Sequence, residues 1–211
     1  MATGELQRLS NDFVLRAQRI HASFQATDHP QTATCCPTTH KHTRALCVIE
    51  LHNTWTQYCR DLVFTSALGG VRTRSGILIS KSPLLVASND VMNALRVTYR
   101  PRTKPSYWEP RWSIATETID AATRLRIANL SNVNAALGSV TSTAEEIRHA
   151  RNYLSHRKGD TALKAIKALS MHGATSPLDI DALLTSYVVS GVMLFEYWVT
   201  NLSLISIAAC D

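Results

Sequence analysis

Two side chains on one short stretch of the sequence have the chemistry needed to cleave a phosphodiester without a metal ion. They are Arg151 and His156, with Asn152 beside the arginine. A histidine takes up or releases a proton near neutral pH, and the fork of donors on a permanently charged arginine fits a phosphate. In RNA, a base and an acid would move two protons while the ribose 2′-hydroxyl attacks the adjacent phosphorus. Asn152 would orient the phosphate or hold the imidazole.

The segment that carries these residues predicts a helix with a defined start and stop. The pairs Ser142–Glu145 and Thr143–Glu146 both have the spacing of a capping box. Gly159 is expected to end the helix, after basic residues that suit the negative end of the helix dipole.

The spacing of the arginine and the histidine sets a geometric condition on any shared site. At about 100° per residue, Arg151 and His156 project roughly 140° apart on a regular helix. Contact within one chain requires that the long arginine side chain reach round or that the helix unwind near Gly159. A third arrangement brings Arg151 of one chain to His156 of another across a two-fold axis.

Arg151-Asn152, followed after three residues by His156, resembles the signature of the HEPN superfamily. The likeness continues upstream, where residues 108–112, 120–130 and 135–138 resemble HEPN proteins of the RiboL-PSP type. Together with the helical patterning of the chain, this resemblance implies an all-α fold. We expect a HEPN-like up-and-down helical bundle that forms a single domain over residues 1–211, with an irregular insertion around residues 69–113.

The resemblance also implies an activity. Similar HEPN proteins are metal-independent endoribonucleases, and two copies of the motif face each other at a dimer cleft. Carried over, Arg151, Asn152 and His156 are the catalytic residues of a homodimer that needs no cofactor. It would leave 2′,3′-cyclic phosphate and 5′-hydroxyl ends, as a toxin or defence nuclease under an unidentified regulator or antitoxin. Family toxins often carry a tyrosine two residues after the histidine. Lys158 stands there in this chain, so silencing by adenylylation of that tyrosine does not carry over.

Other polar residues are candidates for binding RNA or for supporting the site. The candidate RNA contacts are Arg148, His149, Ser155, Arg157, Lys158, Arg102 and Lys104. The last two lie in a segment where basic residues alternate with aromatic ones, which suits either base stacking or a structural connection whose tryptophans enter the core. Glu50, His52 and Asn53 form a polar cluster that would support the Arg151/His156 site or lie on a solvated face.

Composition favours an RNA partner and an intracellular setting. The net charge of +6 and the pI of about 9.2 suit an anionic partner, although they also fit many ordinary proteins. The five cysteines are odd in number and no apolar signal segment precedes them, so we expect free thiols in the cytoplasm. One cluster is consistent with either a zinc site or a polar loop: Cys35, Cys36, His40 and His42. Adjacent cysteines are not a usual zinc spacing. We therefore expect no metal.

The remaining pattern predicts further helices and no membrane span. Helices are expected at residues 4–25, 43–68, 83–99, 114–130, 162–171 and 176–209, with a short strand or extended loop at 77–79. The last is apolar for long enough to cross a bilayer, but Glu196 and Asn201 lie inside it and make insertion costly.

Two alternatives to a nuclease remain open. One is a HEPN-type module that binds RNA or a nucleotide without cleaving it. The other is a helical dimerisation or interaction protein.

Overall fold

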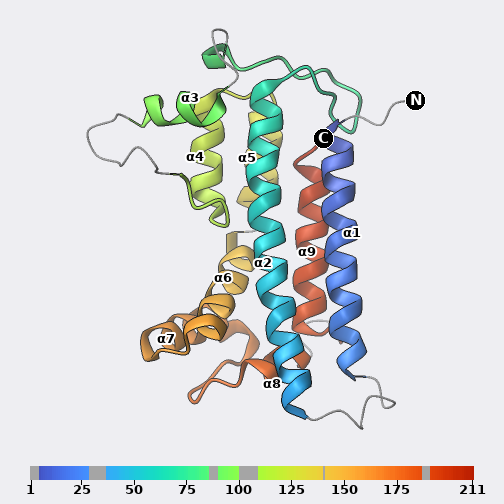
Figure 1. Cartoon of the computed structure of the whole chain (residues 1–211), viewed down its shortest axis with the longest axis vertical. Coiled ribbons are helices and arrows are strands. Elements are labelled where there is room, and N and C mark those ends of the chain that lie inside the picture. The colour runs from blue at the N-terminus through green and yellow to red at the C-terminus, as the bar shows by residue number, and fades with distance from the viewer. Residues whose placement is uncertain (1–4, 29–36, 86–89, 100–108, 140, 187–190) are drawn as a thin grey trace. The chain divides into compact units, whose positions relative to one another are not determined.

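The computed structural model describes residues 5–28, 37–85, 90–99, 109–139, 141–186 and 191–211 (Figure 1). Over these residues the fold is all-α, as predicted, with turns and loops between the helices and no strand. The α-helices are α1 (Glu5–Gln25), α2 (Pro37–Leu68), α3 (Val91–Thr98), α4 (Ala115–Leu125), α5 (Leu130–Gly138), α6 (Thr141–His156), α7 (Gly159–Ala168), α8 (Ile180–Thr185) and α9 (Leu194–Ala208). Short 3₁₀ turns lie at Ala26–Asp28, Pro83–Leu85 and Ser170–His172.

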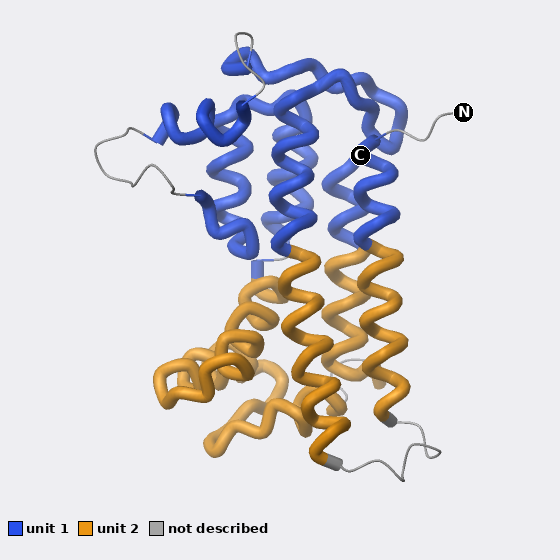
Figure 2. The backbone as a smooth tube through the Cα atoms, viewed as in Figure 1, with its two compact units in different colours: residues 1–13, 56–141, 204–211 blue, residues 14–55, 142–203 orange. Residues whose placement is uncertain are grey.

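The chain divides into two compact units (Figure 2). Unit 1 comprises Met1–Phe13, Thr56–Thr141 and Leu204–Asp211, and unit 2 comprises Val14–Trp55 and Ser142–Ser203. Each unit is thus assembled from separate parts of the chain, and α1, α2 and α9 contribute residues to both. The expectation of a single domain stays a prediction.

Unit 1 is built around the second half of α2 and the pair α4 and α5. Tyr58 is 3% exposed. Its ring packs against Phe13 in a tilted arrangement, with 5.0 Å between ring centroids, and its hydroxyl donates to the Ser206 carbonyl at 2.7 Å. After α2 the chain turns at Gly69, where an added Cβ would lie 2.3 Å from the backbone nitrogen of Lys81. Only glycine fits this close approach, which confirms the predicted end of the helix.

Unit 2 holds the candidate site and a second apolar core. Phe24 of α1 stacks on Phe195 of α9 with ring centroids 4.2 Å apart, and Trp198 is fully buried beside Phe195. Arg44 of α2 donates to the Thr27 hydroxyl and to both carboxylate oxygens of Asp181. These contacts connect α1 with α9, and α2 with α8 and the turn at Ala26–Asp28.

Apolar residues that recur at helical spacing in the sequence are predicted to lie in the core, and their burial confirms this. The stripe on α2 (Leu51, Trp55, Tyr58 and Leu62) is buried throughout, as is most of the one on α1 (Leu6, Phe13, Ile20 and Phe24). On α9, the stripe residues Phe195, Trp198, Leu202 and Ile205 are buried as well. Helical periodicity therefore located the core correctly.

Several predicted helix boundaries are wrong. The expected helix at 176–209 is two helices, α8 and α9. Asp179 caps α8, and its side chain accepts from the Ala182 nitrogen at 3.1 Å. Between α8 and α9, Ser186 is extended and Gly191 has a φ of +75°. No described helix is both long and apolar enough to cross a membrane.

The other boundary corrections also come from single backbone positions. Arg126 adopts a left-handed φ of +53°, which ends α4 inside the expected helix at 114–130. Pro83 opens only a 3₁₀ turn, and α3 begins instead after Asp90, whose side chain accepts from the Asn93 nitrogen. The segment at 77–79 is extended, with one bridge between Arg72 and Leu78.

Candidate functional site

Helix α6 is anchored through its first half. Glu146 is 8% exposed and accepts a hydrogen bond of 2.8 Å from the indole nitrogen of Trp198, and His172 Nε2 lies 3.1 Å from the same carboxylate oxygen. The capping boxes predicted at Ser142 and Thr143 are wrong, because the helix already begins at Thr141. Thr143 is buried, and its hydroxyl accepts from Asn201 at 3.4 Å. A buried carboxylate thus holds the helix that carries the motif.

The C-terminal end of α6 differs from the sequence expectation. The helix ends at His156 because Arg157 adopts a left-handed φ of +44°, so Gly159 is not the stop residue. Gly159 instead begins α7, and the Thr161 hydroxyl donates to the Lys158 carbonyl at 2.8 Å. Since α7 follows after so short a turn, its first two turns lie beside the end of α6.

The imidazoles of α6 line an open pocket of about 200 Å³, which we call the histidine pocket. His149, Asn152 and His156 share one face, because positions i, i+3 and i+7 fall within about 60° on a helix. The full lining is Arg148, His149, Asn152 and His156 from α6 with Thr161 and Lys164 from α7. Thr161 and Lys164 were not predicted as site residues from the sequence. Their pattern predicted a helix, but the tight turn that brings it to His156 depends on the conformation of Arg157.

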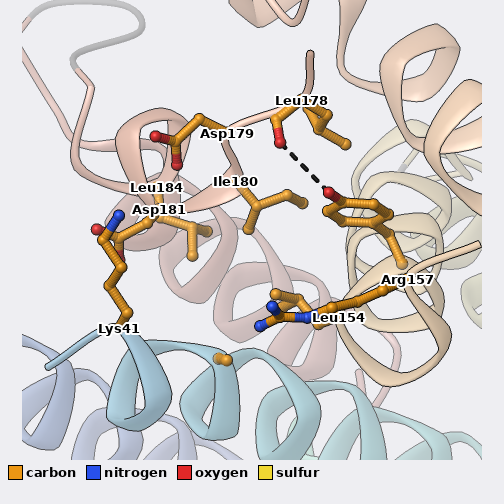
Figure 3. Close-up of a pocket in the computed structure, with 10 residues that line it drawn as sticks. Lys41, Leu154, Arg157, Leu178, Asp179, Ile180, Asp181 and Leu184 are labelled. Atoms are coloured by element: carbon orange, nitrogen blue, oxygen red, sulfur yellow. Dashed lines mark hydrogen bonds between the residues drawn. The ribbon is translucent and has the colours of Figure 1, made fainter. Parts of the chain in front are cut away.

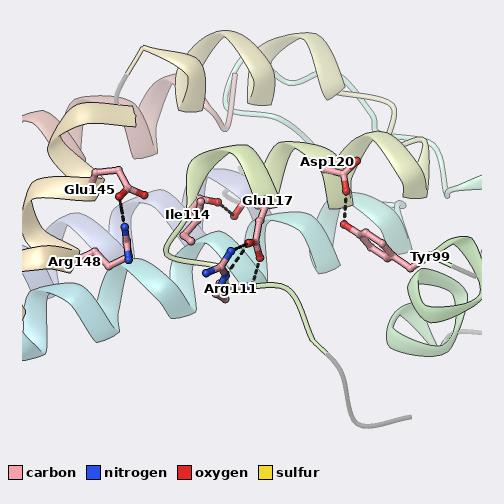
Figure 4. A network of polar contacts seen from close by, with 8 residues as sticks. Tyr99, Arg111, Ile114, Glu117, Asp120, Glu145 and Arg148 are labelled. Carbon is pink, nitrogen blue, oxygen red and sulfur yellow. Dashed lines mark hydrogen bonds and ion pairs between the residues drawn. The ribbon is translucent and has the colours of Figure 1, made fainter. Parts of the chain in front are cut away.

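Burial and neighbouring positive charges favour the neutral form of His149. Arg148 pairs with Glu145 (Figure 4), and its Nη2 also lies 2.8 Å from Nε2 of His149. Burial first, and then the charge of Arg148, lower the pKa of His149, with Lys164 adding to the effect. Glu145, at 3.3 Å, acts in the opposite direction but is outweighed. A neutral imidazole can accept a hydrogen bond from Arg148 and, once that bond is released, a proton.

Arg151 lies outside the histidine pocket. Its Nη1 donates to the Asn152 side-chain oxygen at 3.2 Å, while its Nε is buried and has no hydrogen-bond partner among the described residues. α6 is regular through His156, so the unwinding considered for the helix end does not occur before Arg157. Within one chain, Arg151 and His156 therefore remain on separate faces, as their spacing predicts.

His52 of α2 lies close enough to Arg148 and Arg151 of α6 for their charges to act on it. Burial is the main cause that lowers its pKa. The charges of Arg151 and Arg148 lower it further, against a hydrogen bond with Asn53. Of the predicted supporting cluster, His52 is thus brought toward α6, whereas Asn53 is exposed and contacts His52. Glu50 instead lines a separate pocket with Arg16 and Arg19.

The other predicted site residues are spread over the surface or lie outside the described residues. Ser155 and Lys158 are exposed, and Arg157 lines a second pocket. Arg102, Lys104, Cys35 and Cys36 are outside the described residues. Within the described part of the chain, His, Cys, Asp and Glu form no group of three or more suited to a metal ion.

The second pocket, which we call the Arg157 pocket, has a volume of about 160 Å³ (Figure 3). Its polar lining is Lys41, Tyr153, Arg157, Asp179 and Asp181, and its apolar lining is Ala45, Leu154, Leu178, Ile180 and Leu184. The Tyr153 hydroxyl donates to the Leu178 carbonyl at 3.4 Å. The two pockets thus lie against the same last turns of α6.

No family model, curated protein or solved structure matches this chain.

Proposed function

We propose that the protein is a metal-independent endoribonuclease of the HEPN type that acts as a homodimer in the cytoplasm. The observation that supports this most is the histidine pocket. Two imidazoles, an amide and two cations surround one open cavity of about 200 Å³. These are the groups that metal-free cleavage of a ribose phosphodiester requires.

The arrangement suggests a role for each group. The neutral His149 takes the proton of the ribose 2′-hydroxyl, whose oxygen forms a bond to phosphorus. His156 gives a proton to the 5′-oxygen as its bond to phosphorus breaks. Arg148 and Lys164 bind the phosphoryl oxygens and Asn152 orients them. The products are a 2′,3′-cyclic phosphate and a 5′-hydroxyl.

Arg148 links substrate arrival to the release of the base. In the free protein it lies 2.8 Å from His149 Nε2, the atom that must receive the proton. A phosphate is a stronger partner for a guanidinium than a neutral imidazole is, because the hydrogen bond is charge-assisted at both ends. Binding of RNA therefore draws Arg148 from His149 and frees the nitrogen.

Arg151 enters the proposal through the dimer. Its buried Nε lacks a partner among the described residues, and in one chain it faces away from His156. Across a two-fold axis, Arg151 of one protomer meets His156 of the other, and each site then has both groups.

Mixing two inactive variants tests this proposal. Arg151→Ala and His156→Ala should each abolish cleavage of RNA in EDTA. Mixed and allowed to exchange protomers, they should recover about a quarter of the wild-type rate, because half of the dimers then hold one intact site of two. No cleavage by the wild type would reject the nuclease. No recovery on mixing, together with a wild-type dimer, would reject the composite site.

Binding of RNA without cleavage is the second candidate. It is favoured by the pairing of Arg148 with Glu145, which occupies the arginine closest to His149. In that case RNA should bind to the wild type with a strong dependence on salt, and Arg148→Ala should weaken binding while no products form. A plain interaction module would show neither property.

A further inference from the structure

The residues that line the Arg157 pocket are suited to one kind of ligand. We propose that this pocket binds a guanine base, and that this base belongs to the RNA nucleotide next to the bond cleaved in the histidine pocket. The first part stands on the lining of the pocket alone, and the second rests on the proposed function.

The size of the pocket limits its occupant. A volume of about 160 Å³ lies below the ~300–1,000 Å³ of pockets that hold drug-sized ligands. One flat ring system fits, whereas a dinucleotide does not. Leu154, Ile180 and Leu184 provide apolar walls for the faces of such a ring, and Tyr153 adds an aromatic side chain.

The carboxylates of the pocket require a partner that presents N–H donors. Asp181 accepts hydrogen bonds from Arg44, at 3.1 and 3.2 Å to its two oxygens, which fix its carboxylate in place. One oxygen of Asp179 accepts from Ala182 N at 3.1 Å and so caps α8. The second oxygen and the other lone pair of the first can still accept from a ligand. Both are acceptors only.

The cations of the pocket require acceptors on the same ligand. Lys41 and Arg157 form no ion pair among the described residues, and Figure 3 shows them on opposite sides of the cavity, with the two aspartates on the Lys41 side. The planar guanidinium of Arg157 can stack on a base, as such groups commonly do in complexes with single-stranded RNA.

Guanine satisfies both requirements at once. Its N1–H and N2 amino group form an adjacent pair of donors that matches a carboxylate, while its O6 and N7 accept from a lysine. Adenine and cytosine each place a ring acceptor beside their amino group, which would face the Asp179 carboxylate. Uracil offers one donor between two acceptors. The proposed contacts are thus Asp179 to the donor edge and Lys41 to the acceptor edge.

The location of the pocket connects it with the cleavage site. Tyr153 and Arg157 line the Arg157 pocket, while Asn152 and His156, the residues directly before them, line the histidine pocket. A base held on one side of the helix end would therefore place its own phosphate near the imidazoles on the other side.

Nucleotide titration of the full-length protein tests the guanine assignment. We expect calorimetry to show that 5′-GMP binds at least about tenfold more tightly than 5′-AMP or 5′-UMP. Asp179→Asn should remove this preference. Asparagine is as good an N-cap as aspartate, so α8 and the melting temperature should be retained. Asp12→Asn, at an exposed carboxylate outside the pocket, is the matched control. Equal binding of the three nucleotides, or no binding of any, would overturn the proposal.

Mapping of cleavage sites tests the link to RNA. The wild type should cut next to guanosine, and Asp179→Asn should cut without base preference while His156 still acts. If 5′-GMP binds selectively but no RNA is cleaved, the guanine pocket stands and the nuclease fails. If RNA is cleaved at all four bases and 5′-GMP does not bind selectively, the nuclease stands and the guanine pocket fails. Selective binding of 5′-GMP with unselective cleavage would overturn the substrate role alone.

Discussion

Two polar regions, one in each unit, use similar residues in different ways. Around α4 in unit 1, Arg111 pairs with Glu117, and Tyr99 donates to Asp120 at 2.5 Å (Figure 4). Arg124 donates to the same carboxylate at 2.9 Å. Around the end of α6 in unit 2, Arg151 bonds only a neighbouring amide in the described structure, and His156, Arg157 and Lys158 are exposed with no ion pair there.

The difference separates polar groups that hold the fold from groups that are free to bind a ligand. In the network around α4, each of these arginines already meets a carboxylate, and the Arg124 guanidinium also lies 4.1 Å from the centre of the Tyr99 ring. Near the end of α6, cations and imidazoles surround two cavities instead. Substitutions in the first region should therefore change stability slightly, and those in the second should change binding and catalysis.

The largest effect is expected from the two histidines. His156→Ala and His149→Ala should each lower the cleavage rate by about 10²- to 10⁴-fold, because each histidine transfers one proton in the proposed mechanism. A substrate in which sulfur replaces the leaving 5′-oxygen distinguishes the two roles, because a thiolate leaves without being protonated.

That substrate should restore much of the rate to His156→Ala and little to His149→Ala, measured as single-turnover cleavage against the oxygen substrate. Restoration in His149→Ala alone would reverse the two roles. Restoration in neither variant would show that His156 is not the acid.

A stability effect of about 2–3 kcal/mol is expected from Glu146→Ala. The change leaves the buried indole N–H of Trp198 and the His172 imidazole without the carboxylate that both contact. Glu117→Ala breaks an ion pair whose arginine side chain is 71% exposed, so it should cost under about 1 kcal/mol. Urea unfolding of both variants compares their free energies of unfolding directly. Equal losses would show that the buried Glu146 contributes no more to stability than the surface ion pair.

A smaller effect should appear in the pH dependence of stability. Burial and the charges of Arg151 and Arg148 lower the pKa of His52 in the folded state. The unfolded chain then binds the proton more readily, so the free energy of unfolding should fall as pH drops below about 6.5. His52→Gln should make this fall shallower, in denaturant unfolding between pH 7.5 and 5.5. A steeper fall in the variant would contradict the assigned environment.

The smallest effect is expected from Arg111→Ala. Its ion pair with Glu117 lies at the surface, so the loss of stability should stay below about 1 kcal/mol and RNA cleavage should not change. Arg148→Ala, which also breaks an arginine–glutamate pair, should lower cleavage at least about tenfold. Similar cleavage rates for the two variants would show that the α6 pair is structural as well.

The sequence predicted much of the fold because burial follows helical periodicity. The stripes on α1 and α2 and the residues of α9 were found from spacing alone. The boundaries that failed depend on backbone conformations that residue type does not dictate, such as the left-handed φ of Arg126 and Arg157. Arginine rarely adopts this conformation, so no sequence signal marks it.

The candidate site was predicted in part for the same reason. Helical geometry alone placed Arg151 and His156 on separate faces, whereas His149 was expected only as an RNA contact. Lys164 and Asp179 reach the pockets through the turn at Arg157 and the packing of α8, which are tertiary features. Glu146 was interpreted as a capping residue, and only its contact with Trp198, 52 positions away in the chain, reveals its role.

Analysis of the RNA ends tests the central claim most directly. Wild-type protein should be incubated with a defined single-stranded RNA in excess EDTA, and the fragments identified by mass spectrometry beside His156→Ala. We predict a 2′,3′-cyclic phosphate on one fragment and a 5′-hydroxyl on the other, with no fragments from the variant. Intact RNA with the wild type, or 3′-hydroxyl and 5′-phosphate ends, would contradict cleavage by the imidazoles of α6.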